Sequence, residues 1–236
     1  MTDRAGWNLP RRAASLSIGI ISADLMRLGA DIGRLEAGGA RICHFDVMDG
    51  RFCPTVTFGP WFVGGLETTM IKDVHLMVED PVAVVDDYVS SGADIVTVHL
   101  EAGRHVHRAL ERIGESAQGS NTSPLRGLGV NPGTPMSSVE PYLDVVDVIY
   151  VLGINPGWRQ SLLPSTLGRV RAAQELVASA DREILVAVDG GITLENFASV
   201  AALHPDIVVS GSAVFKGGEV EANLGKFTEL GRKSLD

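Results

Sequence analysis

Residues 41–50 read RICHFDVMDG, a short apolar run that carries polar side chains toward its end. In a β-strand the side chains of residues i and i+2 point to the same face, so His44 and Asp46 share one face and Phe45 points to the other. We therefore expect a strand whose carboxyl end presents an imidazole and a carboxylate side by side.

Similar runs recur along the 236-residue chain, and longer amphipathic stretches separate them. The eight apolar, β-branched runs are residues 15–21, 41–47, 71–77, 94–99, 126–131, 147–152, 183–188 and 206–210. Strands that alternate with helices, without a break in composition, predict one closed (β/α)8 barrel, a TIM barrel, rather than a doubly wound sheet. We expect this single domain to span residues 14–236, with an irregular arm over residues 1–13.

The composition excludes several classes of protein. A net charge of −9 argues against a surface for nucleic acid or for an anionic membrane. No apolar run is long enough to span a bilayer. Arg11 and Arg12 precede an apolar stretch, but serines and glycines interrupt it, so it is typical of a first strand rather than an export leader. Cys43 and Cys53 form neither a disulfide framework nor a C-x-x-C motif, and we expect a reducing, cytoplasmic location.

Two more polar residues end apolar runs. His75 lies near the end of the run 71–77, and Asp189 directly follows the run 183–188. The carboxyl ends of the strands carry the chemistry in (β/α)8 barrels, so these two side chains should meet His44 and Asp46 there. Any one of them alone could be a hydrogen-bonded polar residue without further role. Together they predict a site for one divalent metal ion, and zinc, iron, manganese and cobalt all accept two imidazoles and two carboxylates.

Such a centre suits proton transfer beside a carbonyl group. A metal ion that polarises adjacent carbonyl and hydroxyl oxygens acidifies the C–H bond between them and stabilises the enediolate that remains. Asp46 and Asp189 come from different runs, so one could remove a proton from one face and the other could return a proton to the opposite face. Backbone amides after the last two runs, at Gly190-Gly191 and at residues 210–213 (SGSA), could hold a phosphate.

The sequence also resembles a known protein family over nearly its whole length. Six segments, in order between residues 17 and 215, resemble the ribulose-phosphate 3-epimerase family. These segments are residues 22–24 (SAD), 44–50 (HFDVMDG), 73–78 (DVHLMV), 155–157 (NPG), 188–192 (VDGGI) and 210–213 (SGSA). The resemblance implies a (β/α)8 barrel of the ribulose-phosphate-binding type. It also implies a divalent metal ion and epimerisation at C3 of a ketose phosphate through an enediolate.

Carried over by position, the resemblance assigns roles to individual residues. It implies that His44, Asp46, His75 and Asp189 bind the metal ion, and that Asp46 and Asp189 are also the acid/base groups. The residues implied to contact the substrate are His75, Met48, Met77, Gly157, Trp158, Arg159, Gly190, Gly191, Gly211 and Ser212. The expected partner is a small sugar phosphate, by default D-ribulose 5-phosphate and D-xylulose 5-phosphate, and we expect a homo-oligomer.

Three departures from the family leave the substrate open. Gly19 stands where the family has a serine, and Leu152 stands where it has a pocket methionine. The loop after residues 155–157 reads Trp-Arg-Gln, one residue shorter than usual and without two glycines. An epimerase for another tetrose, pentose or hexose ketose phosphate is one alternative, and a sugar-phosphate-binding barrel without turnover is another. A decarboxylase or aldolase is disfavoured, since no run ends in a lysine.

Two further residues stay without an assigned role in catalysis. His99 ends the fourth run and can reach the pocket, but it is not counted among the expected ligands. Asp49 is expected either to cap the turn after the second run or to orient a ligand.

Overall fold

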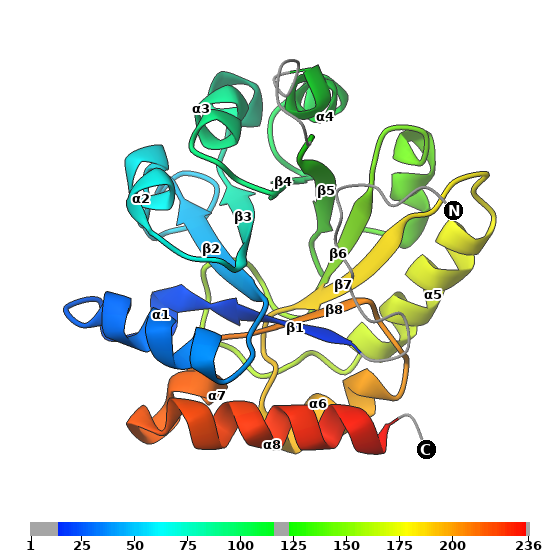
Figure 1. Cartoon of the computed structure of the whole chain (residues 1–236). Helices are drawn as coiled ribbons and strands as arrows, with labels where there is room; N and C mark the ends of the chain where they lie inside the picture. The colour runs from blue at the N-terminus through cyan, green and yellow to red at the C-terminus, as the bar shows by residue number, and fades with distance from the viewer. Residues whose placement is uncertain (1–13, 116–122, 235–236) are drawn as a thin grey trace.

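The computed structural model describes residues 14–115 and 123–234, so the expected arm over residues 1–13 lies outside the described residues. Eight parallel strands close into a barrel in the order of the sequence, and β8 pairs with β1 (Figure 1). The strands are β1 Ser15–Gly19, β2 Ile42–Met48, β3 Ile71–Met77, β4 Ile95–His99, β5 Leu125–Val130, β6 Val148–Leu152, β7 Leu185–Asp189 and β8 Ile207–Ser210. The predicted (β/α)8 barrel is confirmed.

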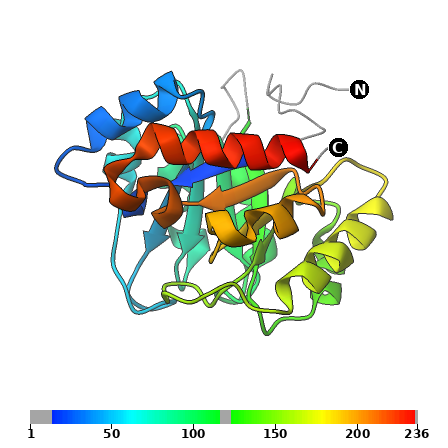
Figure 2. The ribbon, with the colours of Figure 1, turned by 90° about the horizontal axis from the view of Figure 1, so that it is seen from below.

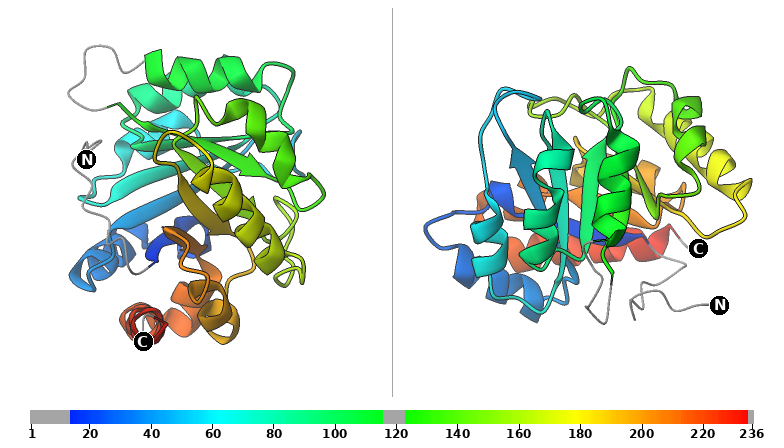
Figure 3. Two further views of the ribbon diagram at one scale, coloured as in Figure 1. Left: turned by 90° about the vertical axis from the view of Figure 1, so that its right-hand side faces the viewer. Right: turned by 90° about the horizontal axis from the view of Figure 1, so that it is seen from above.

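Helices surround the strands on the outside. The α-helices are α1 Leu28–Ala37, α2 Pro60–Gly65, α3 Val85–Ser90, α4 Val106–Glu115, α5 Thr166–Ala178, α6 Leu194–Ala201, α7 Ser212–Phe215 and α8 Val220–Lys233. Short 3-10 helices are η2 Ile20–Ser22, η3 Pro81–Ala83, η4 Met136–Tyr142 and η5 Lys216–Gly218. Figure 2 shows α8 along the outside of the barrel, where it contacts α1 and α6. Figure 3 shows α3 beside α4, with which it packs.

The strand bounds differ from those expected by at most two residues at either end. The first strand ends at Gly19 because residues 20–22 already turn as a 3-10 helix. The first α-helix begins only at Leu28, after a turn in which the backbone N–H of Met26 donates to the side chain of Asp24. Among the described residues no helix is long and apolar enough to cross a membrane.

Two apolar cores hold this arrangement together. The larger one lies between strands and helices and includes Phe45, Val74 and Phe197. The smaller one lies inside the barrel and consists of Ile42, Ile95, Leu125, Val148, Tyr150, Leu152, Ala187, Ile207 and Val209. Several of its aliphatic members stand at or near the beginnings of their strands, so they fill the amino end of the barrel. The inward positions toward the carboxyl end are therefore left for polar groups.

The pairing of β2 with β3 brings the polar inward positions of the two strands together. The parallel register sets His44 beside Asp73, and Asp46 beside His75. One step further, Met48 stands beside Met77. Successive inward residues of the two strands thus form a ladder that leads to the open end of the barrel.

Candidate active site and metal centre

The structure brings together the four residues predicted to bind a metal ion. His44 and Asp46 come from β2, His75 from β3 and Asp189 from β7, and one ligand atom of each lies within 4.8 Å of all the others. The Nε2 atom of His44 lies 3.6 Å from Oδ1 of Asp46 and 3.7 Å from Oδ2 of Asp189. The Nδ1 atom of His75 lies 3.1 Å from the same Asp189 oxygen. The two imidazole nitrogens and the two carboxylates thus surround a space about the size of a metal ion.

The donor set fits a divalent cation. Nε2 of His44 and Nδ1 of His75 are both buried and lack a hydrogen-bond partner within the described part of the chain. Buried polar atoms are rarely left unpaired, because the loss of water is then uncompensated. A cation between these two nitrogens and the two carboxylates would satisfy the nitrogens and balance the negative charge.

Asp73 sets the direction in which His44 points. Its carboxylate is fully buried and accepts hydrogen bonds from the hydroxyls of Ser17 and Tyr150, each at 2.9 Å. Nδ1 of His44 lies 2.7 Å from the same carboxylate. The carboxylate accepts a hydrogen bond from Nδ1–H, so the lone pair on Nε2 of His44 faces the carboxylates of the centre. Asp73 was not predicted as a site residue, although it stands on the same strand face as His75 at the i, i+2 spacing.

The electrostatics favour positive charge at this point. Burial by itself would lower the pKa of His44, but the neighbouring carboxylates of Asp73 and Asp46 hold the pKa well above its ordinary value. Burial likewise opposes ionisation of Asp46, but the neighbouring His44 imidazole nevertheless holds the pKa of Asp46 below its usual range. Surroundings that stabilise a protonated imidazole in this way would also stabilise a bound metal ion.

His99 reaches the site, as its position at the end of the fourth run allowed, and contacts His75 there. Its Nε2 atom lies 2.7 Å from Nε2 of His75, and its Nδ1 atom lies 3.3 Å from Oε2 of Glu101. The ring is fully buried, and burial lowers the pKa of His99 to about 4. His99 is therefore neutral at physiological pH. The signal in the sequence is the i, i+2 pair His99 and Glu101 at the end of the fourth run.

Asp49 organises the turn after β2. Its side-chain oxygens accept the backbone N–H groups of Arg51, Phe52 and Glu79 at 2.8 to 2.9 Å. Of the two roles expected for Asp49, the structure supports the capping of the turn.

The predicted phosphate-binding segments lie at the same end of the barrel. Gly190 and Gly191, directly after Asp189, have left-handed φ angles of 91° and 75°. A β-carbon at Gly191 would lie 2.7 Å from the backbone nitrogen of Leu162, so a larger residue cannot occupy this turn. Gly211 directly follows β8, and a β-carbon there would lie 2.6 Å from the carbonyl oxygen of Gly19.

The loop over residues 155–160 reaches across the mouth of the barrel. Gly157 has a φ of 77°, and a β-carbon there would lie only 2.8 Å from Cβ of Cys53, in the loop after β2. Trp158 is 57% exposed, and Arg159 is exposed as well. Gln160 turns back onto its own loop and accepts a hydrogen bond of 3.0 Å from the side chain of Asn155. The side chain of Arg159 is thus free to move toward a ligand.

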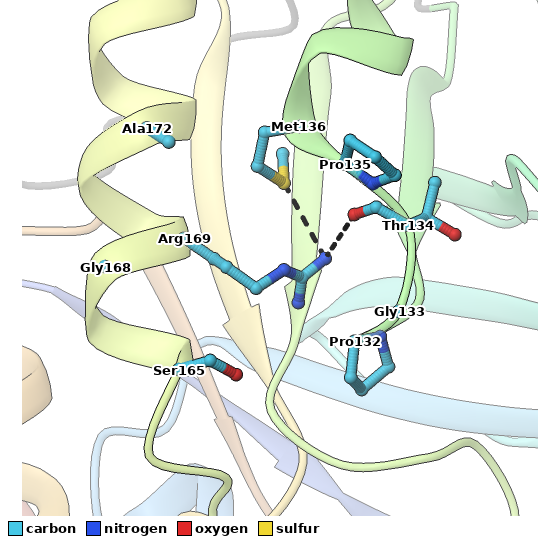
Figure 4. A pocket seen from close by; sticks show the side chains of 9 residues that line it. All are labelled: Pro132, Gly133, Thr134, Pro135, Met136, Ser165, Gly168, Arg169 and Ala172. Atoms are coloured by element: carbon cyan, nitrogen blue, oxygen red, sulfur yellow. Dashed lines mark hydrogen bonds between the residues drawn. The ribbon is translucent and has the colours of Figure 1, made fainter.

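A separate pocket of about 340 Å³ lies between α5 and the turn after β5 (Figure 4). Its lining residues are Pro132, Gly133, Thr134, Pro135, Met136, Ser165, Gly168, Arg169 and Ala172. The guanidinium of Arg169 points into it and donates to the carbonyl oxygens of Leu152 and Asn131 at 2.8 and 2.7 Å. Since these carbonyls stand at strand ends, we interpret Arg169 as a support of the barrel rim.

Comparison with known proteins agrees with this geometry. The family model described as the ribulose-phosphate 3 epimerase family matches residues 15–215. The ribulose-phosphate 3-epimerase of Rhodobacter capsulatus is 38% identical over 211 residues, which cover 89% of each chain. That of Escherichia coli (strain K12) is 39% identical over 200 residues, 83% of this chain and 86% of the relative. The structure of 3-hexulose-6-phosphate synthase from Salmonella typhimurium superimposes with a TM-score of 0.64 at 13% identity, over 94% of this chain and 99% of that one, a likeness of fold.

Proposed function

Since this chain belongs to the ribulose-phosphate 3-epimerase family, we propose that it inverts C3 of a ketose phosphate with the help of one divalent metal ion. The default substrates are D-ribulose 5-phosphate and D-xylulose 5-phosphate. The observation that carries the proposal is the cluster of His44, His75, Asp46 and Asp189, whose ligand atoms lie within 4.8 Å of one another. Zinc, iron, manganese and cobalt all suit this ligand set.

Two aspartates move the proton in this proposal. When bound, the metal ion would polarise the carbonyl and hydroxyl oxygens of the substrate and so acidify the C3–H bond. Asp46, as the carboxylate, takes the proton from one face of C3 and leaves a planar enediolate, and Asp189, which starts as the carboxylic acid, gives its proton to the opposite face. The reverse reaction exchanges the two roles. The two carboxylates come from different strands and lie 3.6 and 3.7 Å from the same nitrogen, Nε2 of His44, which supports this assignment.

The other side chains of the site bind and orient the substrate. Met48 and Met77, neighbours in the β2–β3 register, line the pocket near the enediolate with polarisable sulfur atoms. The backbone amides of Gly190-Gly191 and of Gly211-Ser212 hold the phosphate group. The exposed loop at 157–159 (Gly-Trp-Arg) closes over the substrate, and Arg159 adds a charge-assisted contact.

One observation favours a substrate other than ribulose 5-phosphate. A β-carbon at Gly19 would lie 3.8 Å from Oδ2 of Asp46, so the glycine leaves free the position from which a serine would contact the reacting part of the substrate. Leu152 also replaces a pocket methionine and packs into the inner core beside Asp189. We therefore propose, as the second candidate, the same reaction on a ketose phosphate of different length or hydroxyl configuration.

One experiment separates these possibilities. The protein is incubated with four-, five- and six-carbon ketose phosphates in deuterated water, and both deuterium at C3 and the epimeric product are measured. Exchange with epimerisation is expected, and the highest kcat/KM identifies the substrate. Binding without any exchange would contradict an epimerase and support a barrel that only binds sugar phosphates.

We also propose a cellular setting and an assembly. Both cysteines are free and buried, which suits a reducing compartment such as the cytoplasm. Met26, Val56 and Trp61 are large apolar side chains with exposed fractions of 93%, 74% and 79%. Apolar groups of this size on the surface support association into a homo-oligomer. Light scattering of the purified protein would show whether it forms a homo-oligomer.

A further inference from the structure

The hydrogen-bonding direction of His75 follows from its place in the site. Its Nδ1 atom faces Asp189, and its Nε2 atom meets His99 at 2.7 Å. A neutral imidazole carries one proton, and a nitrogen that binds a metal ion must offer its lone pair. If Nδ1 binds the ion, the proton is on Nε2, and His75 donates it toward His99.

The same reasoning determines the proton of His99. Because Nε2 of His99 must accept from His75, its own proton is on Nδ1. Nδ1 faces Oε2 of Glu101 at 3.3 Å, and a carboxylate can only accept. Each group in the series can therefore donate a hydrogen bond to the next, His75 to His99 and His99 to Glu101.

Glu101 is held in place by the turn after β5. Its Oε1 atom accepts the backbone N–H of Asn131 at 2.9 Å and the hydroxyl of Thr134. With two donors on Oε1, the Oε2 atom is left for His99. Burial would raise the pKa of Glu101, but the hydrogen bonds from His99, Thr134 and Asn131 keep the pKa low, so the group is a carboxylate at neutral pH.

The ring of His99 has little freedom to turn away. It stacks on the ring of His75, with centroids 4.8 Å apart and an interplanar angle of 17°. Phe52 covers it at a centroid distance of 4.7 Å. On a third side, a β-carbon at Gly129 would already lie in van der Waals contact, 3.4 Å from the Nε2 and Cε1 atoms of His99, so the ring rests against the backbone of β5.

From this geometry we infer that His99 and Glu101 are positioning residues for the metal centre. With His75 they form a hydrogen-bond series, here named the imidazole relay, which sets the tautomer of His75 and makes its Nδ1 a stronger ligand. Asp73 orients His44 directly, whereas Glu101 acts on His75 through a second imidazole. The inference rests on the metal centre of the proposed function and extends it to two residues that touch neither metal nor substrate.

The Glu101→Gln variant tests the direction of the relay while it preserves the shape of the side chain. The Gln carbonyl is expected to stay with the donors of Asn131 and Thr134, which turns the amide NH2 toward His99. His99 must then accept at Nδ1 and carry its proton on Nε2, so two donors face each other between His99 and His75. Changes to groups that orient a metal ligand typically cost about 10- to 100-fold in metal affinity, and we expect a loss of that size.

The measurement is the affinity of the metal-free protein for zinc, by competition with a chromophoric chelator and without substrate. Glu36→Gln is the matched control, because Glu36 also accepts a backbone N–H and threonine hydroxyls, from Thr68 and Thr69, and makes no hydrogen bond or ion pair with a histidine of the described residues. His99→Phe, which keeps a ring but cannot accept, is a second variant and is expected to lose as much affinity. Nitrogen-15 NMR of the zinc-loaded protein should place the His99 proton on Nδ1 in the wild type and on Nε2 in Glu101→Gln.

Each outcome is decisive. Loss of affinity in Glu101→Gln and His99→Phe, but not in Glu36→Gln, supports the relay. Wild-type affinity in Glu101→Gln overturns the relay and leaves the metal centre intact. An equal loss in Glu36→Gln, or an unmoved His99 proton, also overturns it. A wild-type protein that binds no metal ion would overturn the proposed metal centre and the relay together.

Discussion

At the scale of single residues, the proposed proton transfer depends on where two carboxylates lie. Asp46 and Asp189 belong to β2 and β7, which are separated in the barrel by β8 and β1. Each nevertheless lies within 3.7 Å of Nε2 of His44. Two carboxylates that approach one point from different strands can address the two faces of a planar intermediate.

We therefore predict that Asp46→Asn and Asp189→Asn each abolish epimerisation, while one of them retains exchange of the C3 proton from a single face. The loss should reach or exceed the roughly 10²- to 10⁴-fold typical of acid–base groups, because each residue is also a proposed ligand. Product formation, deuterium exchange and metal content are measured for each variant, with Asp181→Asn, at an exposed position, as the control. A near wild-type rate in either variant would rule out the two-base assignment.

Gly19 is the residue at which substrate choice can be tested most directly. Its φ of −68° and ψ of 96° suit any residue, and a β-carbon would lie 3.3 Å from Cα of Gly211, which is close but tolerable after a small shift. In Gly19→Ser we expect the ratio of kcat/KM for ribulose 5-phosphate over the preferred substrate to rise by about five- to ten-fold, as one hydrogen bond of about 1 kcal/mol implies. An unchanged ratio across the panel of ketose phosphates would show that Gly19 does not select the substrate.

The sequence predicted the four residues that the structure brings together in one cluster, but not the roles of Asp73 and Glu101 beside it. His44, His75 and Asp189 stand at or near the ends of apolar runs, so the periodicity of a strand was enough to bring them together. Asp73 and Glu101 act through contacts with Tyr150, Thr134 and the backbone of Asn131, all from later parts of the chain. Such contacts depend on the barrel register and on side-chain directions, which a local pattern does not contain.

At the scale of elements, the strands were predictable to within about two residues and the loops were not. Alternation of apolar residues marks a strand, whereas the end of β1 depends on the 3-10 turn of residues 20–22. The contact of the loop at 155–160 with Cys53 joins segments that follow β6 and β2, and only the closed barrel brings them face to face.

This contact gives a prediction for the β6–α5 loop. Gly157→Ala combines the cost of a left-handed φ, about 1–2 kcal/mol, with a β-carbon only 2.8 Å from Cys53 Cβ. The loop should therefore close less readily over the substrate, and KM should rise by about ten-fold with a smaller change in kcat. Gly29→Ala, at an exposed position in α1 with free space around the added methyl, is the control. Equal KM values in the two variants would show that loop closure does not contribute to binding.

At the scale of the whole molecule, the barrel, the family and the enzyme class, an isomerase acting on carbohydrates, are the confirmed predictions. Polar residues and glycines occupy the carboxyl end of the barrel, so contacts in other parts of the barrel must stabilise the closed sheet. At the amino end, Asp147 precedes β6 and binds Arg126 of β5 and Arg182, which lies just before β7. Three consecutive strands are thus joined by one carboxylate.

Asp147→Asn should accordingly destabilise the barrel. Breaking a buried ion pair costs about 3–5 kcal/mol, and partial exposure of the arginines, 23% for Arg126 and 19% for Arg182, should reduce this to roughly 2–3 kcal/mol. Asp86→Asn is the matched control, because Asp86 pairs with Arg112 at the surface, where the two side chains are 40% and 34% exposed. The Asp86→Asn variant should lose no more than about 1 kcal/mol of its free energy of unfolding.

The stability lost in Asp147→Asn must also depend on pH, and it must shrink in acid. Burial would raise the pKa of Asp147, but the hydrogen bonds and charges of Arg126 and Arg182 hold the pKa of the folded state below its ordinary value. A carboxyl with a lowered pKa stabilises the folded state above its unfolded pKa of about 3.9, and this contribution disappears as the pH falls through the folded-state pKa. In urea unfolding, the difference between wild type and Asp147→Asn should be constant near neutral pH and shrink below about pH 4. A difference that stayed the same in acid would mean that Asp147 supports the barrel by its hydrogen bonds alone, without its charge.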